Sequence, residues 1–233
     1  MPARLPDNPK FYQKRFMPMR HARLFPWLLA LALPVTVLAN PYERQLANGL
    51  RIIVKEDRRA PTVAHMVWYR AGSMDEKNGT TGVAHVLEHM MFKGTPAAGP
   101  GEFNRRVAAA GGRDNAFTSR DYTAYFQQVP KHKLSDMMQL EADRMRHLTL
   151  DSGEFAQEIR VVMEERRLRT EDQPQALLFE QLMATALQAH PYRVPIIGWM
   201  NDLENMTATD ARAWYESWYV PNNAYVVVVG DVD

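Results

Sequence analysis

Strand-forming and helix-forming stretches follow one another in this chain without regular alternation. Strand-like residues flank an Asn48-Gly49 pair, recur in TVAHMVWYRAGS and RDNAFTSRDYTAYFQQV, and return in the final stretch AYVVVVGDVD. Asn-Gly is the pair that two-residue hairpin turns favour, so residues 42–57 are predicted to form two antiparallel strands. The final strand is predicted to be buried. This order predicts an α+β fold, in which a mixed, largely antiparallel sheet packs against helices.

Six stretches between the strands have apolar residues at helical spacing together with start or stop signals. Gly94 and a glycine pair end the first two, and Pro130 and Pro174 are predicted to open two others. Asp151 and either Thr207 or Thr209 are candidate N-caps. The predicted helices cover residues 79–94, 100–112, 130–147, 151–171, 174–190 and 207–219.

The composition narrows the chemistry that the chain can carry. Its 233 residues suffice for one large domain or two small ones, and 46% hydrophobic residues are typical of a folded protein. A formal net charge of +1 gives no reason to expect a nucleic acid as partner. The absence of cysteine excludes disulfides and thiolate metal sites. Any metal would have to be bound by His, Asp or Glu.

The N-terminus has the layout of a secretory signal. Arg20 and Arg23 precede the apolar run LFPWLLALALPVTVLA, which ends in Val37-Leu38-Ala39. The run is shorter than the roughly 20 residues that a membrane span needs, although an uncleaved membrane anchor stays open as the alternative. Residues 1–39 are therefore predicted to be a leader, with Met17 or Met19 as an alternative initiator. An exported, periplasmic domain would begin at residue 40 and extend to residue 233.

The segment AHVLEHMMFKGT, residues 84–95, carries the strongest chemical signal. On a helix, His85 and His89 lie one turn apart on the same face and can direct two imidazoles at one ion. Glu88 lies beside that face, where it can reach a water on the metal. A zinc hydrolase needs this combination, because the ion lowers the pKa of its bound water and a carboxylate takes up the proton. The alternative is an amphipathic helix with two histidines, since the pair alone lacks a third ligand.

HVLEHMMFKGT resembles the inverted zinc motif of the pitrilysin/insulinase metallopeptidases. The similarity is greatest to the branch that contains mitochondrial processing peptidase β subunits and their bacterial relatives. It extends from about Tyr42 to Asp233. The resemblance implies Zn²⁺, one ion per chain, with a third ligand from a glutamate on a later helix. Glu165, within EIRVVMEERRLRTED, occupies that position.

The same resemblance assigns further residues. Glu158 matches a second glutamate seven positions before the ligand, where it would orient a histidine of the site. Seven residues span two helical turns, so Glu158 and Glu165 share a helix face. The segment GGRDNAFTSRDYTAYF is similar to the strand that accepts the peptide substrate edge to edge. Asn115, Ala116 and Phe117 are its candidate substrate-binding residues. Alternatively, Asn115 is only a turn residue. The remaining histidines are interpreted as structural.

The predicted function is that of a zinc-dependent endopeptidase acting on peptides or unfolded polypeptides, with Glu88 as general base. Family members are usually about twice as long, and their second homologous domain closes a chamber over the zinc. The resemblance therefore implies that a second domain or a partner subunit is needed here. The alternative is a non-catalytic partner or scaffold subunit of a heterodimer, which occurs in this family when the motif degenerates.

Overall fold

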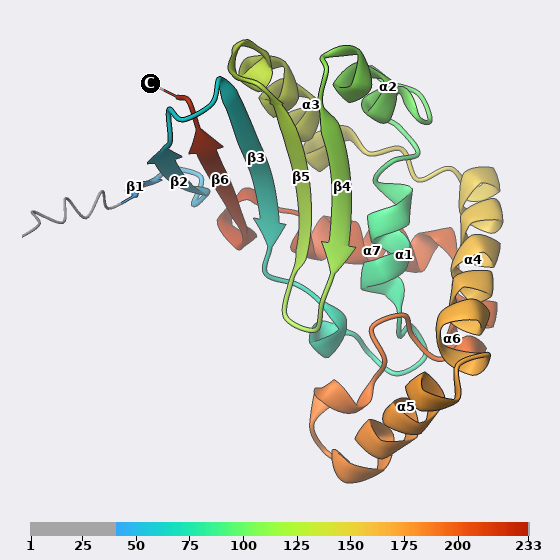
Figure 1. Cartoon of the computed structure of the whole chain (residues 1–233). Coiled ribbons are helices and arrows are strands. Elements are labelled where there is room, and N and C mark those ends of the chain that lie inside the picture. The colour runs from blue at the N-terminus through green and yellow to red at the C-terminus, as the bar shows by residue number, and fades with distance from the viewer. Residues whose placement is uncertain (1–40, 233) are drawn as a thin grey trace, which may run out of the picture. The chain divides into compact units, whose positions relative to one another are not determined.

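The computed structural model describes residues 41–232, and the predicted leader at residues 1–39 lies outside them. Six strands form one sheet in the order β1-β2-β6-β3-β5-β4 (Figure 1). All neighbouring strands are antiparallel except the parallel pair β2 and β6. The prediction of an α+β fold with a largely antiparallel sheet is confirmed. The strands are β1 (Tyr42–Gln45), β2 (Arg51–Glu56), β3 (Thr62–Tyr69), β4 (Arg113–Thr118), β5 (Thr123–Pro130) and β6 (Ala224–Gly230).

The helices follow the predicted order, with one addition. The short helix α6 is not predicted from the sequence, because its six residues are too few to show a helical period. A five-residue π-helical turn, Arg167–Glu171, continues α4. The α-helices are α1 (Val83–Met90), α2 (Glu102–Ala109), α3 (Leu134–His147), α4 (Ser152–Arg166), α5 (Pro174–Ala186), α6 (Met200–Asn205) and α7 (Ala208–Trp218).

Two of the predicted helix caps agree with the structure, whereas several other predicted helix boundaries differ from it. The Asp151 side chain accepts the N–H groups of the first turn of α4, and Thr207 caps α7. By contrast, Pro130 is the last residue of β5, and α3 begins four residues later. The helix α1 ends four residues before Gly94, and α5 ends at Ala186 rather than near residue 190. Capping and breaking residues are local signals, and they carry no information about contacts with distant segments, which also influence where a helix starts and ends.

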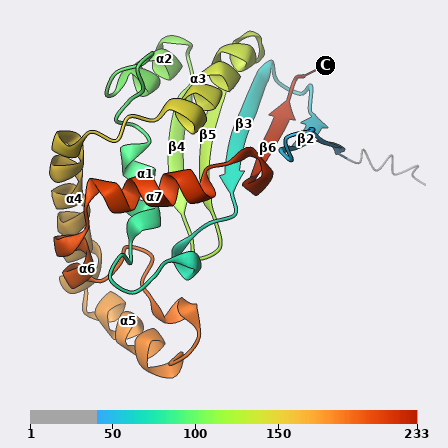
Figure 2. The same cartoon turned by 180° about the vertical axis from the view of Figure 1, so that it is seen from behind.

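Within residues 41–232, helices cover only one face of the sheet. In β3, Val63, His65, Val67 and Tyr69 are buried, and the residues between them are half-exposed. Figures 1 and 2 show α3 and α7 on the same side of the sheet. The strand β6 alternates in the same way, so the predicted buried strand is buried on one face only. Successive side chains of a strand point to opposite faces, and one layer of helices covers only one of them.

The buried histidine of β3 belongs to a polar cluster beneath α3. His65 Nδ1 lies 2.9 Å from Gln127 Oε1, and Gln127 donates to Glu141, which forms an ion pair with Arg144. The Arg144 guanidinium also lies 4.0 Å from the ring centre of Phe103. These partners satisfy His65 within the core, as the structural interpretation of this histidine predicts.

The site is built where α1, α4 and the edge of the sheet meet. The strand β4 forms one edge, because it pairs only with β5 among the described strands. Figure 1 shows α1 beside β4, with α4 on the far side of α1. No helix within residues 41–232 is both long enough and apolar enough to cross a membrane.

Candidate metal centre

The first turn of α1 is fixed by residues outside the helix. Gly82, at its N-cap, has a φ of +88°, and a Cβ there would lie 2.5 Å from the Ile197 carbonyl oxygen. Only glycine fits such a position without strain. The Glu76 carboxyl accepts the N–H groups of Gly82 and Ala84 at 2.7 and 2.9 Å. These contacts provide acceptors for two of the N–H groups that a helix start leaves unpaired.

A second carboxylate holds the loop before α1. Asp202, on α6, accepts hydrogen bonds from the N–H groups of Gly79 and Thr81 at 3.2 Å and from the Thr81 hydroxyl at 2.5 Å. The same hydroxyl accepts the N–H of Trp199. The segment preceding the histidine helix is therefore attached to a part of the chain about 120 residues later. These contacts set the position at which α1 presents its histidines.

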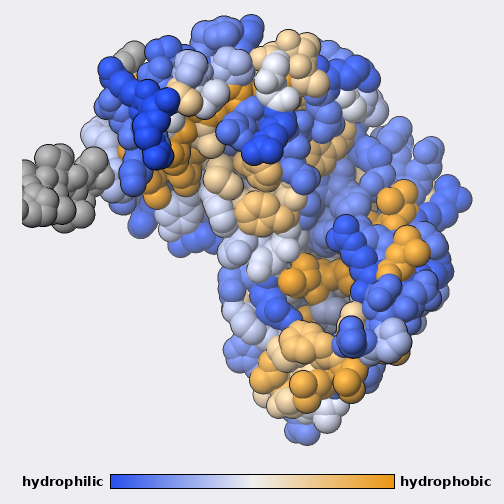
Figure 3. Space-filling model, viewed as in Figure 1, coloured by the Kyte–Doolittle hydropathy of each residue, from blue (hydrophilic) through white to orange (hydrophobic). Residues whose placement is uncertain are grey.

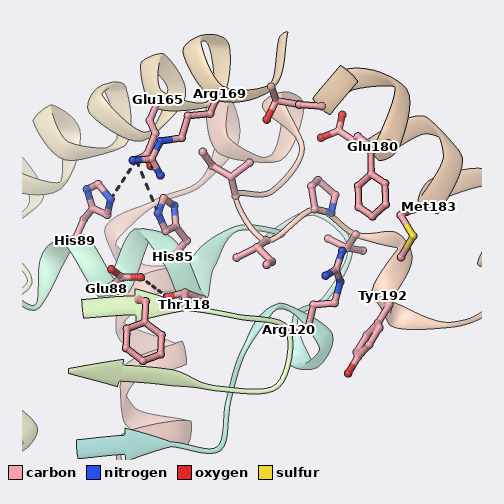
Figure 4. A pocket seen from close by; sticks show the side chains of 18 of the residues that line it. His85, Glu88, His89, Thr118, Arg120, Glu165, Arg169, Glu180, Met183 and Tyr192 are labelled. Atoms are coloured by element: carbon pink, nitrogen blue, oxygen red, sulfur yellow. Dashed lines mark hydrogen bonds and ion pairs between the residues drawn. The ribbon is translucent and has the colours of Figure 1, made fainter. Parts of the chain in front are cut away.

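His85, His89 and Glu165 lie together at the junction of α1 and α4 (Figure 4). Among the described residues they form the single group of three metal-binding side chains, with one ligand atom of each within 4.8 Å of the others. Glu165 Oε2 lies 3.8 Å from His85 Nε2 and 3.4 Å from His89 Nε2. The ligand atoms of a tetrahedral zinc site, with bonds of about 2.0–2.1 Å, lie about 3.3 Å apart. The arrangement fits Zn²⁺ in spacing and in donor type.

The protonation of the two histidines also suits a metal. Burial, the neighbouring His89 and the positive charge of Arg169 lower the pKa of His85 to about 3. The ring is therefore neutral at physiological pH, which is the form that binds a metal. His89 Nδ1 lies 2.8 Å from Glu158 Oε1, a contact that directs the proton to Nδ1 and leaves Nε2 free for an ion.

Two cations hold the carboxylates of α4 in place. Lys93 forms an ion pair with Glu158. Burial raises the pKa of Glu158, but the hydrogen bonds from Lys93 and His89 outweigh it, so that the pKa is lowered. Arg169, in the π-helical turn, contacts Glu165 Oε1 at 2.6 Å and leaves Oε2 facing the histidines.

Glu88 points toward the sheet edge rather than at the other two carboxylates. The hydroxyl of Thr118, the last residue of β4, donates to Glu88 Oε2 at 2.5 Å (Figure 4). Burial raises the pKa of Glu88, and this hydrogen bond opposes the effect. A carboxylate with a raised pKa is better suited to take up and release a proton near neutral pH.

A cavity of about 600 Å³ lies in front of these residues. Asn115, Ala116 and Phe117 line it from β4, so the structure brings the predicted substrate strand next to the histidines. Within β4, Asn115 Oδ1 accepts the N–H of Ala116 at 2.9 Å. Every site residue named from the sequence lies either in this cavity or, as Glu158 does, directly behind it.

The sequence does not reveal several residues that complete the site. Thr118, Arg169 and Tyr192 line the cavity without any motif that marks them. Glu76 and Asp202 act on α1 from a distance. The only sequence signal for Glu76 and Asp202 is that they are acidic, and acidic residues are too common in the chain for this signal to single them out.

Comparison with known proteins identifies the family. Residues 51–198, which include the whole candidate centre, match the model of the insulinase family, peptidase family M16. The chain belongs to this family. Residues 205–233 match a second model, described as the peptidase M16 inactive domain. The resemblance inferred from the histidine motif is confirmed.

Individual relatives are longer than this chain. The zinc protease PqqE of Helicobacter pylori is 40% identical over 81% of this chain and 43% of its own length. The mitochondrial-processing peptidase subunit beta of Lentinula edodes is 30% identical over 81% of this chain and 40% of its own. The chain therefore spans less than half the length of these two relatives.

Two solved structures share the fold. A Helicobacter pylori protease superposes with a TM-score of 0.82 at 38% identity, over 84% of this chain and 47% of the other. The periplasmic protease PqqL from Escherichia coli has a TM-score of 0.76 at 28% identity, over 83% of this chain and 22% of its own. The six-stranded fold is thus one that known proteases of this family adopt.

Proposed function

We propose that residues 40–233 are the metal-binding domain of a zinc-dependent endopeptidase. The observation that carries this proposal is the convergence of His85, His89 and Glu165, with Glu88 between them and the sheet edge. Two imidazoles and one carboxylate form a three-residue ligand set of the kind found in catalytic zinc sites, where the fourth position stays open. One Zn²⁺ per chain is expected.

Each residue then has a defined task. Zn²⁺ held by these ligands would supply a Lewis acid and a water that ionises near neutral pH. Glu88 accepts the proton of the attacking water and passes it to the leaving amine. Thr118 orients Glu88 through its hydroxyl. Glu158 fixes the tautomer and ring orientation of His89.

The substrate would be an extended peptide. The free edge of β4 offers main-chain donors and acceptors that pair with any extended chain, whatever its side chains. Asn115 would then exchange the Ala116 N–H for a hydrogen bond to the substrate backbone. Because folded proteins seldom expose such a segment, peptides and unfolded polypeptides are the proposed substrates.

A second domain, in the same chain or in a partner subunit, is proposed to close the cavity. The PqqE relative is more than twice as long as the region that it shares with this chain, which leaves room for a second domain over the cavity. The apolar side chains exposed on α5 and seen in Figure 3 lie beside this cavity. They would be covered in the completed assembly. The exposed set beside the cavity is Leu177, Leu178 and Leu182, whereas Phe179 lines the cavity itself.

Export to the periplasm is proposed on the basis of the leader and the periplasmic location of PqqL. Cleavage after Ala39 would leave Asn40 as the mature N-terminus. N-terminal sequencing of the protein from the periplasmic fraction tests this step. Recovery of a membrane-bound form that retains residues 20–38 would support an anchor instead.

Zinc content is the first test of the centre. The purified chain should hold about one zinc ion, and His85→Ala, His89→Ala or Glu165→Gln should lose it. Glu164→Gln is the matched control, because this neighbour on α4 forms its ion pair with Arg167 at the surface. Full zinc content in Glu165→Gln would remove Glu165 from the ligand set.

Glu88→Gln separates catalysis from metal binding. Glutamine keeps the size of the side chain but cannot take up a proton, so zinc should stay bound while hydrolysis falls by orders of magnitude. Normal turnover would show that another group is the base. A non-catalytic scaffold subunit, the rival function, would show no hydrolysis even with zinc bound and a second domain present.

A further inference from the structure

The cavity continues beyond the metal centre into a region with apolar walls. Phe179 and Met183 line this region from α5, and Val194 and Pro195 line it from the segment after residue 193. Arg120, in the turn between β4 and β5, also lines this region, beside Tyr192 (Figure 4). A side chain that enters this region would therefore meet methylene and aromatic groups together with a guanidinium.

The carboxylates that line the cavity are all engaged. Glu88 and Glu165 belong to the metal centre, and Glu180 forms a buried two-point ion pair with Arg166 at 2.9 Å. Arg120 and Arg193 also line the cavity. Neither of these two arginines forms an ion pair within residues 41–232, where the contact of Arg193 is a hydrogen bond to the Gln188 carbonyl. The region beyond the metal therefore has a positive charge without a counter-ion.

The position of Arg120 leaves its donors available. Its guanidinium carbon lies 5.3 Å from the ring centre of Tyr192. This cation–π contact attracts the guanidinium to the face of the ring and uses none of its N–H donors. Both carboxylate oxygens of Asp121 accept the Tyr192 hydroxyl at 2.7 Å, and this contact holds the ring. Arg120 Nε is a buried donor without an acceptor. A buried donor without an acceptor is unfavourable, and a ligand carboxylate would supply both the missing acceptor and a negative charge.

The direction of the substrate follows from the edge strand. Antiparallel pairing is the more stable arrangement. A peptide antiparallel to β4 enters near Thr118 and Arg120 with its N-terminal residues and leaves toward Arg113. Thr118 contacts Glu88, so the scissile bond lies near Thr118. A strand rises about 3.3 Å per residue, so Arg120 faces residues within about three positions of that bond on its N-terminal side.

We propose that Arg120, together with Arg193, forms a subsite for an acidic side chain on the N-terminal side of the scissile bond. This inference rests on the proposed peptidase function and adds a substrate preference to it. Glutamate matches the region well, because its methylene groups would pack against Phe179 and Met183 while its carboxylate reaches the guanidinium. A lysine at the same place would bring a third cation without an ion pair into the cavity.

Three sets of fluorogenic peptides test the subsite. They share one sequence and carry Glu, Gln or Lys in turn at each of the three positions before the scissile bond. Their affinities are measured with the zinc-loaded Glu88→Gln chain, which binds without cleaving, and their kcat/KM values with the unmodified chain. At 50 mM salt or below, the best Glu peptide should bind about tenfold to a hundredfold more tightly than its Lys counterpart.

Variants assign the preference to the arginines. Arg120→Gln and Arg193→Gln should each reduce the Glu-over-Lys ratio at least about threefold, and Arg120→Glu should invert it. Arg105→Gln, which removes an equal charge from exposed α2, is the control and should leave the ratio unchanged. Circular dichroism of each variant checks that it is folded.

The possible failures are distinguishable. Equal binding and cleavage of the Glu, Gln and Lys peptides would overturn the subsite and leave the peptidase standing. A preference for Glu that persists in folded Arg120→Gln and Arg193→Gln would also overturn it. Selective binding of Glu peptides without hydrolysis, even with a second domain supplied, would support the subsite and contradict the peptidase.

Discussion

Glu76 should make the stability of the chain fall as the pH rises. Glu76 is half-buried, and its carboxyl accepts the N–H groups of Gly82 and Ala84 at the start of α1. Burial raises its pKa from 4.5 to about 8, against the effect of these two hydrogen bonds. The folded state therefore keeps a proton that the unfolded chain releases near pH 4.5.

The magnitude follows from this pKa difference. The contribution of Glu76 to the free energy of unfolding is largest below about pH 4.5, where both states are protonated. Between about pH 4.5 and 8 it falls by up to about 1.4 kcal/mol per pH unit, and it levels off above pH 8. The full change amounts to about 5 kcal/mol as an upper limit.

Glu76→Gln isolates this term from the other titrating groups. Glutamine stays neutral at every pH and loses one acceptor, which costs about 1–2 kcal/mol independently of pH. The variant should be less stable than the unmodified chain at pH 5 and more stable at pH 9. Urea unfolding at five pH values, with a chelator present so that metal binding does not contribute, measures both.

The control is Glu43→Gln, which removes an exposed carboxylate from β1. Its difference from the unmodified chain should stay within about 0.5 kcal/mol at every pH. If the difference between Glu76→Gln and the unmodified chain changes by less than about 1 kcal/mol from pH 5 to 9, burial does not dominate the ionisation of Glu76, and the reasoning is refuted.

Three further predictions concern the centre and the cavity. Glu158→Gln should weaken zinc binding about tenfold to a hundredfold in competition with a fluorescent chelator, because His89 loses the partner that orients it; an unchanged affinity would contradict this role. Thr118→Val should lower kcat about tenfold at constant zinc content, because Glu88 loses one hydrogen bond worth about 1.4 kcal/mol. Normal turnover would show that another group orients Glu88. Supplying the second family domain should raise kcat/KM by on the order of a hundredfold at constant zinc content, because a peptide that this domain alone does not enclose is poorly positioned. Equal rates for the single domain and the assembly would show that the single domain positions the peptide by itself.

Local features of the sequence determine much of the fold. The Asn48-Gly49 pair marks the position of the first hairpin turn, although the loop has three residues, 47–49, rather than two. The alternation around His65 predicts a strand with one buried face. The spacing of His85 and His89 brings both onto one face of a helix, because helix geometry is fixed by the backbone alone. These predictions depend on neighbours within a few residues, which the sequence shows directly.

Other contacts of the site depend on the tertiary structure. Glu165 could be named only through the family resemblance, since nothing local to α4 distinguishes it from Glu164. Asp202 reaches Thr81 across 121 residues, and Tyr192 reaches Asp121 across 71. Such contacts form between segments that are distant in the sequence. The local sequence of a segment does not determine which distant segment it packs against. The sequence therefore determined which side chains could bind a metal, while the packing of α1, α4, α6 and β4 decided which of them face one another and which charges beyond the metal stay unpaired.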